Sequence, residues 1–371
     1  IDLNQLSFFS TGIACLFALT VAIQLGYYLI VFLRFARFNP SEQNLENNEP
    51  VSVIIAAHNE DFNLEKNMPF IFEQDYPNFE VVIVNHASTD DTHHVLNDFS
   101  RSHKNLKVVN IDEDLNFFKG KKFPLSIGIK SASHEILLLT DADCKPESNQ
   151  WIKQMVSNYD ANTEIILGYG PYSKGESFLN KIIRYDTFMI ALQYFSFAIC
   201  KLPYMGVGRN LSYRKSLFLR NKGFTSHYGI SSGDDDLFIM QASNKANTKI
   251  ELNSSSFMYS EPKPTFKSWI TQKQRHLSTG AAYPLLFKIL LGTYSISHLL
   301  LYISFIILIA NNVLVVPSII LFVIYLTIRF IIQKNALSKL GEGHLLLFSL
   351  FGDFIHIVLL SAISFKSLIK K

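Results

Sequence analysis

Two aspartates one residue apart directly follow a run of apolar, strand-forming residues. The run Ile136–Leu139 leads through Thr140 into Asp141-Ala142-Asp143. Because alternate residues of an extended chain point to the same side, both carboxylates can reach toward one point. Paired carboxylates suit a hard cation such as Mg²⁺ or Mn²⁺, whose shell is usually completed by substrate phosphates. The spacing therefore predicts a metal and diphosphate site, although a polar turn that caps a helix would use the same residues.

Similar polar clusters follow other apolar runs. The expected strands are Val51–Ala57, Phe79–Val84, Leu106–Ile111 and the run before Asp141, and the expected helices are Leu64–Glu73, a segment ending at about Ser100, and Phe123–Ala132. This alternation predicts an α/β domain with a doubly wound, mostly parallel, Rossmann-like sheet. Ligands bind such sheets beyond the carboxyl ends of the strands, where His58-Asn59-Glu60 and Asn85-His86 fall.

The chain then continues with less regular elements. We expect a strand at Ile165–Gly170, a helix at Phe178–Cys200, a turn at Gly206–Asn210, a basic helix over Ser212–Arg220, a helix from Gly233 to about Asn244 and a short strand at Lys249–Leu252. The aromatic helix Phe178–Cys200 suits either a protein core or a membrane surface. Phe266–Thr279 is basic and aromatic, which predicts a helix at a membrane interface.

The composition indicates a chain with a membrane part. The 371 residues are 48% hydrophobic, and the mean hydropathy is +0.17. The net charge of +3 is small and no dense basic patch is present, which argues against a nucleic-acid partner. Cys15, Cys144 and Cys200 are too few and too scattered for a disulfide framework or a zinc site, and they fit a reducing compartment.

The first apolar segment is long enough to cross a bilayer. No charged residue lies between Leu3 and Leu33, and Ile13–Leu33 alone has the required length. Arg34 and Arg37 follow at once, which by the charge rule for membrane proteins places the next part of the chain in the cytoplasm. The segment therefore reads as an anchor and not as a cleaved signal peptide.

The C-terminal part contains further apolar segments. No charged residue lies between Lys288 and Arg329, and Asn311-Asn312 splits this stretch into two predicted spans. His344–Phe365 is a third segment, and Asp353 with His356 lies in its middle. It is either a further crossing or an interfacial or re-entrant helix, since ionisable residues inside a span are costly and basic residues follow it.

The expected organisation has five parts. They are an N-terminal transmembrane anchor at 1–37, a linker at 38–49, a cytoplasmic domain at 50–265, an interfacial region at 266–288 and C-terminal membrane segments at 289–371.

The order of the polar motifs is similar to that of a known enzyme family. The motifs are Ala57-His58-Asn59-Glu60, Asn85-His86-Ala87-Ser88-Thr89-Asp90, Lys119-Gly120-Lys121-Lys122, Asp141-Ala142-Asp143, Gly208-Arg209-Asn210, Gly233-Asp234-Asp235-Asp236-Leu237 and Gln272-Lys273-Gln274-Arg275-His276. Over about Val51–Thr279 this set resembles the membrane-bound family 2 glycosyltransferases. The resemblance implies the GT-A fold, with one N-terminal and two to three C-terminal transmembrane helices.

The resemblance also implies a nucleotide site at the first strand ends. Glu60 would contact the ribose or base, the Asn85-His86 turn would hold the base, and Lys122 would lie near the base or the diphosphate. Asp141 would lie close to the ribose and the metal. The full set of expected nucleotide-binding residues is Ala57, Asn59, Glu60, Asn85, His86, Lys122 and Asp141.

The resemblance further implies that a metal ion and the acidic cluster take part in the reaction. Asp143, with Asp141, would hold the Mg²⁺ or Mn²⁺ ion that neutralises the diphosphate leaving group. The cluster Asp234–Asp236 would supply the general base, and adjacent acids raise one another's pKa, which suits a base near neutral pH. Counting back from Leu237 selects Asp234, whereas matching the family's acidic pair selects Asp235, our first choice. Acids at a helix N-terminus also have a purely structural explanation.

A last group of residues would contact the diphosphate and the acceptor. Gln272 and Arg275 match the family's Gln-x-x-Arg-Trp element, and Arg209 is assigned to the same region. His276 stands where the family has Trp, so the acceptor is expected to differ. His86 stands where the family commonly has Asp to bind uracil; a neutral histidine still accepts one hydrogen bond, so a UDP-sugar remains the expected donor.

The predicted function is inverting, metal-dependent transfer of a hexosyl or N-acetylhexosaminyl group from a nucleotide-diphosphate-sugar to a lipid or lipid-linked glycan. The alternatives are a small processive polysaccharide synthase and a non-catalytic nucleotide-fold subunit of an envelope complex. The expected partners are the donor, the acceptor and the lipid bilayer, without nucleic acid. The expected location is the inner (cytoplasmic) membrane, with the catalytic domain facing the cytoplasm.

Overall fold

The computed structural model describes the backbone of residues 8–40, 44–112 and 120–369, with side chains through residue 364. Contacts divide the described chain into two compact units. The sheet unit comprises Asn39–Thr187 and Phe197–Ala282, and the helical unit comprises the residues up to Phe38, Phe188–Ser196 and the residues from Tyr283. Helix α7 (Phe178–Ile199) supplies residues to both units.

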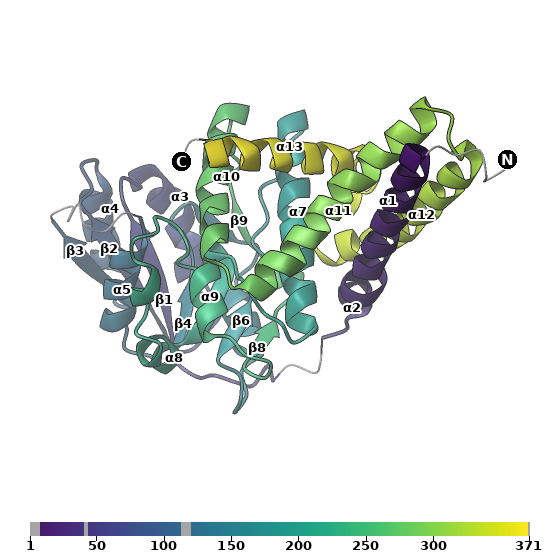
Figure 1. Cartoon of the computed structure of the whole chain (residues 1–371). Helices are drawn as coiled ribbons and strands as arrows, with labels where there is room; N and C mark the ends of the chain where they lie inside the picture. The colour runs from purple at the N-terminus through teal and green to yellow at the C-terminus, as the bar shows by residue number, and fades with distance from the viewer. Residues whose placement is uncertain (1–7, 41–43, 113–119, 370–371) are drawn as a thin grey trace. The chain divides into compact units, whose positions relative to one another are not determined.

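A seven-stranded sheet forms the sheet unit, in the order β3-β2-β1-β4-β7-β6-β8. Figure 1 labels β3, β2, β1, β4, β6 and β8 of this sheet. Its strands are β1 (Val51–Ala57), β2 (Phe79–His86), β3 (Leu106–Ile111), β4 (Ile136–Leu139), β6 (Ile165–Leu167), β7 (Leu211–Arg214) and β8 (Thr248–Ile250). A small second sheet pairs β5 (Cys144–Pro146) with β9 (Met258–Ser260). β1 to β4 pair in parallel, and β7 runs antiparallel to both of its neighbours. The predicted mostly parallel sheet is confirmed.

The parallel strands bring the predicted site residues to one edge. Ala57 at the end of β1 is paired with Asn85 of β2, and Asn85 is paired with Asn110 of β3. The Thr140 N–H donates to the Ile54 carbonyl at 3.2 Å, so the chain leaves β4 beside β1. The polar residues that follow these strands therefore emerge next to one another.

Helices cover both faces of the sheet. The helices besides α7 are α3 (Asp61–Phe72), α4 (Thr92–Ser102), α5 (Lys122–Ser131), α6 (Trp151–Val156), α8 (Lys215–Arg220), α9 (Asp236–Ala242) and α10 (Phe266–Leu277). Val53 and Ile55 of β1 belong to the core formed with α3, α4 and α6. Ile54 points to the opposite face, toward α5. A Cβ on Gly128 of α5 would lie 3.0 Å from Ile54 Cγ2, so only glycine lets this helix approach the sheet so closely.

Strand β7 contradicts the expected helix over Ser212–Arg220. Ser212 is buried and pairs with Leu138 on one side and Ile166 on the other. Helix α8 begins only at Lys215. The basic residues suggested a helix, but pairing with strands distant in sequence determines this segment, and local periodicity does not report such contacts. The three-residue strands β5 and β9 were also missed.

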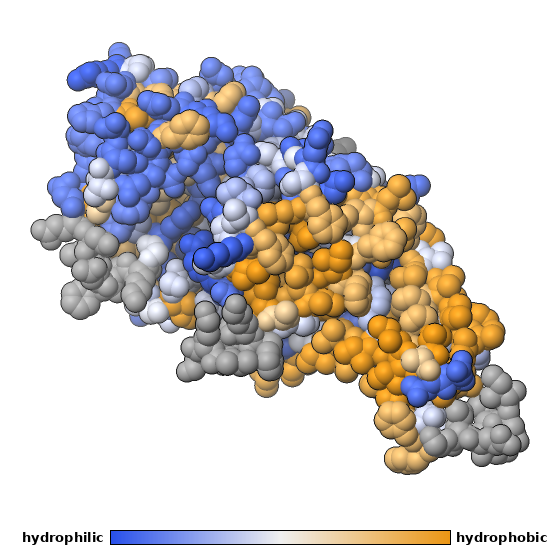
Figure 2. Space-filling model, turned by 90° about the horizontal axis from the view of Figure 1, so that it is seen from above, coloured by the Kyte–Doolittle hydropathy of each residue, from blue (hydrophilic) through white to orange (hydrophobic). Residues whose placement is uncertain are grey.

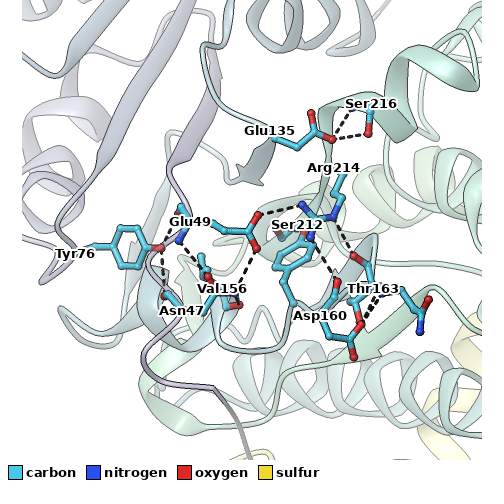
Figure 3. Close-up of polar contacts among 12 residues, drawn as sticks. Asn47, Glu49, Tyr76, Glu135, Val156, Asp160, Thr163, Ser212, Arg214 and Ser216 are labelled. Carbon is cyan, nitrogen blue, oxygen red and sulfur yellow. Dashed lines mark hydrogen bonds and ion pairs between the residues drawn. The ribbon is translucent and has the colours of Figure 1, made fainter.

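The chain before β1 is fixed at the amino end of that strand (Figure 3). The Tyr76 hydroxyl donates to the Glu49 carbonyl at 2.6 Å, and Arg214 pairs with the Glu49 carboxylate at 3.2 Å. Arg214 also donates to the Thr163 carbonyl at 3.1 Å. These contacts hold the sheet unit together at the edge opposite the predicted site.

Three helices of the helical unit are long and apolar enough to cross a membrane. They are Phe8–Arg37, which combines α1 (Phe8–Gly26), the π-helical η2 (Tyr27–Phe32) and α2 (Leu33–Arg37), then α11 (Leu285–Ala310) and α12 (Val315–Lys339). Exposed apolar side chains line them, and Figure 2 shows a broad apolar surface. The predicted N-terminal helix and two C-terminal helices of span length are confirmed. Helix α13 (Ser349–Ile369) has a shorter apolar stretch, Ser349–Ser364.

Asp353 of α13 is fully buried in the helical unit. Its carboxylate lies 2.7 Å from His298 Nε2 of α11, accepts a 3.0 Å hydrogen bond from Tyr302, and pairs with Arg329 of α12. Arg329 also donates to the Ser349 carbonyl at 3.0 Å. An acid among apolar helices is tolerated only with such partners, so Asp353 joins α13 to α11 and α12.

Candidate active site

The loop that carries Asp141 and Asp143 is held by three other elements. Lys121 Nζ, at the start of α5, lies 2.7 Å from Asp141 Oδ1. Asn67 of α3 donates at 3.1 Å to the carbonyl between the two aspartates. Ser260 of β9 donates its hydroxyl to Asp143 Oδ2 at 3.4 Å. The loop therefore has a defined shape before any ligand binds.

The two carboxylates fit the predicted metal. One oxygen of Asp141, one of Asp143 and the Cys144 sulfur all lie within 4.8 Å of one another. The Cys144 thiol is buried and directed at Asp143 Oδ1, at 3.5 Å, which leaves the carboxylates as the hard oxygen donors. Such donors suit Mg²⁺ or Mn²⁺.

Lys121 and Lys122 have different surroundings, and only Lys121 contacts the aspartate loop. Partial burial opposes the charge of Lys121, but Asp141 raises the pKa of Lys121 above its usual range. Lys122 is buried, and its ammonium donates to the carbonyls of His227 at 2.6 Å and Ile230 at 2.7 Å. Burial lowers the pKa of Lys122. Lys122, expected near the base or the diphosphate, thus has its ammonium bonded to two backbone carbonyls, whereas the ammonium of Lys121 lies beside Asp141.

The loops after β1 and β2 are joined to each other. Asn59 has a left-handed backbone with φ of 56°. Its N–H donates to Ser88 Oγ at 3.0 Å, and its side-chain oxygen accepts the Thr89 N–H at 2.7 Å. His58 Nδ1 lies 2.6 Å from the His86 carbonyl. Asn59 and His58 thus set the shape of the loops expected to hold the nucleotide.

The remaining residues that the sequence analysis expects at the nucleotide lie at the same edge. The Glu60 carboxylate accepts from Asn63 at 2.6 Å, and burial raises the pKa of Glu60, as the nearby Asp143 also does. Asn85 is buried and donates to the Asn110 side chain at 3.1 Å. Ala57 is buried at the last position of β1.

The three adjacent acids are placed differently. Asp235 caps α9, because its carboxylate accepts the Asp236 N–H at 2.8 Å and the Gly208 N–H at 2.9 Å. Burial, reinforced by Asp234 and Asp236, raises the pKa of Asp235 to about 8. Asp236 is buried and accepts hydrogen bonds from the Leu237 N–H at 2.7 Å and the Thr279 hydroxyl at 2.6 Å.

Asp234 has no hydrogen bond from another residue in the part of the chain that the structure describes. Burial raises the pKa of Asp234; Lys121 counteracts this and Asp141 reinforces it. The acidic cluster is near the aspartate loop because the preceding segment packs against the start of α5: a Cβ on Gly120, whose φ is 86°, would lie 2.3 Å from the Ser231 carbonyl.

Helix α10 brings the last predicted residues to the sheet unit. It starts with a capping box between Thr265 and Ser268. Lys273 is buried and forms an ion pair with Asp186 of α7. Gln272 donates to the Tyr172 hydroxyl at 3.2 Å. The capping box and the ion pair thereby fix the turn that carries Gln272.

Two arginines complete the charged surroundings of Asp141. Arg275 and His276 are exposed on α10, and Arg209 is partly buried. Burial opposes the charge of Asp141, but Lys121, then Arg209 and Arg275, lower the pKa of Asp141 below its usual range. The structure thus combines anionic ligands for a cation with cationic groups for a diphosphate.

Several residues that contact the site were not identified from the sequence. They are Asn67, Tyr172, Ser260 and Thr279. Lys121 was part of the basic motif, but Lys122 was chosen in its place. The others contact the site through the fold alone and carry no motif. Lys119 of the predicted basic motif lies outside the described residues.

The fold and the acidic strand-end site define a GT-A type nucleotide-binding architecture. The mannosyltransferase PcManGT from Pyrobaculum calidifontis, solved with GDP-Man and Mn²⁺, superposes with a TM-score of 0.57 over 93% of this chain and 99% of its own, at 19% identity. A model described as glycosyl transferase family 2 matches residues 52–220, and one described as glycosyl transferase family group 2 matches residues 147–365, more than half of the chain. The chain belongs to the family 2 glycosyltransferases.

Curated relatives cover parts of the chain. Glycosyltransferase AglE of Haloferax volcanii is 32% identical over 120 residues, which are 32% of this chain and 38% of AglE. Poly-beta-1,6-N-acetyl-D-glucosamine synthase of Staphylococcus epidermidis is 34% identical over 95 residues, 26% of this chain and 22% of the synthase. The chain spans less than half of the length of these relatives. The expected family is confirmed.

Proposed function

We propose that this protein is a metal-dependent, inverting glycosyltransferase that moves a sugar from a nucleotide-diphosphate-sugar to a membrane-associated lipid or glycan. The observation that carries the proposal is the aspartate loop at the carboxyl edge of the sheet, where one oxygen of Asp141 and one of Asp143 lie within 4.8 Å of each other and Lys121 Nζ lies 2.7 Å from Asp141 Oδ1. The segment before the acidic cluster packs against Gly120, next to Lys121, so a base candidate follows the groups suited to a metal-bound diphosphate. The span-length helices in the same chain support an acceptor associated with the membrane.

In this proposal the donor lies across the carboxyl edge of the sheet. The loops after β1 and β2, shaped by Asn59 and His58, border the nucleoside. Asp141 and Asp143 would hold Mg²⁺ or Mn²⁺, which when bound neutralises the diphosphate and makes it a better leaving group. Lys121 and Arg275 supply further positive charge to the diphosphate.

The chemical step is a single displacement. The acceptor hydroxyl oxygen forms a bond to the anomeric carbon while the bond from that carbon to the diphosphate oxygen breaks, which inverts the configuration. The hydroxyl proton passes to a carboxylate. We assign this role to Asp234 in place of Asp235, our first choice from sequence, because Asp235 is oriented by two backbone donors and Asp236 by Thr279.

The test uses the full chain purified in detergent, incubated with Mn²⁺ and either UDP-GlcNAc or GDP-mannose. Release of UDP or GDP is expected with one of these donors, and it should be lost in Asp143→Asn and Asp234→Asn. Added lipid extract should yield a glycosylated lipid with inverted anomeric configuration. Nucleotide binding without turnover in lipid-containing reactions would favour the non-catalytic alternative, and chain extension would favour the processive one.

A further inference from the structure

The segment that extends β6, Gly170–Ser173, contacts residues from two separate site elements. The Gly170 carbonyl accepts a hydrogen bond from Arg209 Nε at 2.8 Å. The Arg209 guanidinium lies over the Tyr172 ring, 4.5 Å from its centroid. The hydroxyl of the same tyrosine accepts from Gln272 at 3.2 Å. One side chain thus touches both Arg209, from the turn before β7, and Gln272, from α10.

The same segment is also fixed to the metal loop. Ser173 N–H donates to the Ser260 carbonyl at 2.9 Å, and Ser260 N–H donates to the Pro171 carbonyl at 3.1 Å. Ser260 is paired on its other side with Cys144, and its hydroxyl reaches Asp143. The position of Tyr172 is therefore set relative to the aspartate loop.

The Arg209 side chain packs so closely against Gly170 that a side chain at position 170 would collide with it. A Cβ at this position would lie 2.4 Å from Arg209 Nε and 2.7 Å from its Cγ. Alanine there would displace the arginine side chain without changing its charge. The conformation of the Arg209 side chain is thus fixed before a ligand binds, by the space at Gly170, the Tyr172 ring and the Gly170 carbonyl.

We propose that Tyr172 is a positioning residue that holds Arg209 and Gln272 together so that both contact the donor diphosphate. This inference rests on the proposed function. A guanidinium stacked on a ring and hydrogen-bonded to a carbonyl has lost most of its freedom before the ligand binds, so its remaining N–H groups can bind phosphate at a small entropic cost. Loss of Tyr172 should therefore weaken binding of the terminal phosphate and leave binding of the nucleoside unchanged.

The test compares Mn²⁺-dependent affinities for UDP, UMP, GDP and GMP by calorimetry. Tyr172→Leu should weaken binding of the diphosphate about tenfold, from loss of the ring contact and the hydrogen bond, and leave the monophosphate affinity unchanged. Tyr172→Phe keeps the ring and should lose about threefold. Tyr76→Phe is the matched control, since Tyr76 and Tyr172 are both 7% exposed and the Tyr76 hydroxyl is bonded at the opposite edge.

A mutant cycle between Tyr172 and the pair Arg209 and Gln272 separates positioning from general stability. In an Arg209→Gln, Gln272→Ala background, Tyr172→Leu should have no further effect on diphosphate affinity, and Gly170→Ala should reproduce Arg209→Gln. Additive losses, or equal losses for mono- and diphosphate, overturn the inference. If wild-type protein binds neither UDP nor GDP, the proposed function itself fails, and that result is distinguishable from either of the others.

Discussion

The Thr279 hydroxyl donates a 2.6 Å hydrogen bond to Asp236 Oδ2. The other oxygen of Asp236 accepts the Leu237 N–H at 2.7 Å. Both oxygens of Asp236 thus accept hydrogen bonds, one from the start of α9 and one from the segment after α10. Its neighbour Asp234 accepts no hydrogen bond from another residue among those the structure describes. Three acids that are equivalent in the sequence therefore have different chemical environments.

The first prediction concerns these acids. Asp234→Asn should lower the turnover number about 10²- to 10⁴-fold, the usual contribution of a general base. Asp236→Asn should lower it far less and should mainly reduce the melting temperature, because it weakens the contact with Thr279. Turnover of the accepted donor and thermal unfolding are measured on both variants. A larger loss of turnover in Asp236→Asn than in Asp234→Asn would contradict the assignment.

The pH dependence of the reaction follows from the same cluster. The base must be deprotonated to accept a proton, and the pKa values of Asp234 and Asp235 are raised, that of Asp235 to about 8. The two carboxylates titrate as a pair. Because the pKa of the assigned base Asp234 is raised, we expect kcat/KM still to rise with pH above pH 6, whereas an aspartate with an ordinary pKa of about 4 would give a flat profile there. Asp235→Asn, which removes one member of the pair, should shift this limb to lower pH.

Lys121 and Lys122 form a matched pair for mutagenesis. Lys121→Met removes the cation next to Asp141 and should weaken Mn²⁺-dependent binding of the nucleoside diphosphate about tenfold, the size of a charged hydrogen bond. Lys122→Met removes a buried ammonium from two carbonyls and should lower the free energy of unfolding by about 1–3 kcal/mol. Calorimetry and thermal unfolding report the two effects. The assignment is wrong if the two variants exchange these phenotypes.

The buried pair in the helical unit should control its stability. Arg329→Met leaves the Asp353 carboxylate without its main partner, and the loss should be about 3–5 kcal/mol. The double variant Arg329→Met, Asp353→Leu removes both charges and should recover most of that loss. Thermal unfolding in detergent measures both. A double variant that is less stable than either single variant would show that the charges are not coupled.

The sequence predicted that the polar residues after the strands lie together, because parallel strands place their carboxyl ends at one edge of the sheet. This rule alone was enough to place four of them at that edge: Asn59, Glu60, Asp141 and Asp143. The rule does not decide between adjacent side chains. Lys121 and Lys122 are consecutive residues at the start of a helix, so they point in directions about 100° apart, and only the surrounding fold selects one of them.

Other features could not be predicted from the sequence, because they depend on contacts between residues that are far apart along the chain. β7 is a strand because β4 and β6 pair with it, although the basic residues of the segment Ser212–Arg220 suggested a helix. Tyr172 acquires its position from Arg209 and Gln272, which lie 37 and 100 residues further along the chain. The partners of Asp353 likewise come from two other helices. Such residues become visible only in three dimensions.

The metal-dependent nucleotide site is tested by measuring the binding of UDP and GDP to the full chain with and without Mn²⁺, in wild type and in Asp143→Asn. Wild-type protein should bind one of these nucleotides tightly only when Mn²⁺ is present, and Asp143→Asn should remove the metal dependence together with most of the affinity. Equal binding without the metal, or unchanged Mn²⁺-dependent binding in Asp143→Asn, would contradict this prediction.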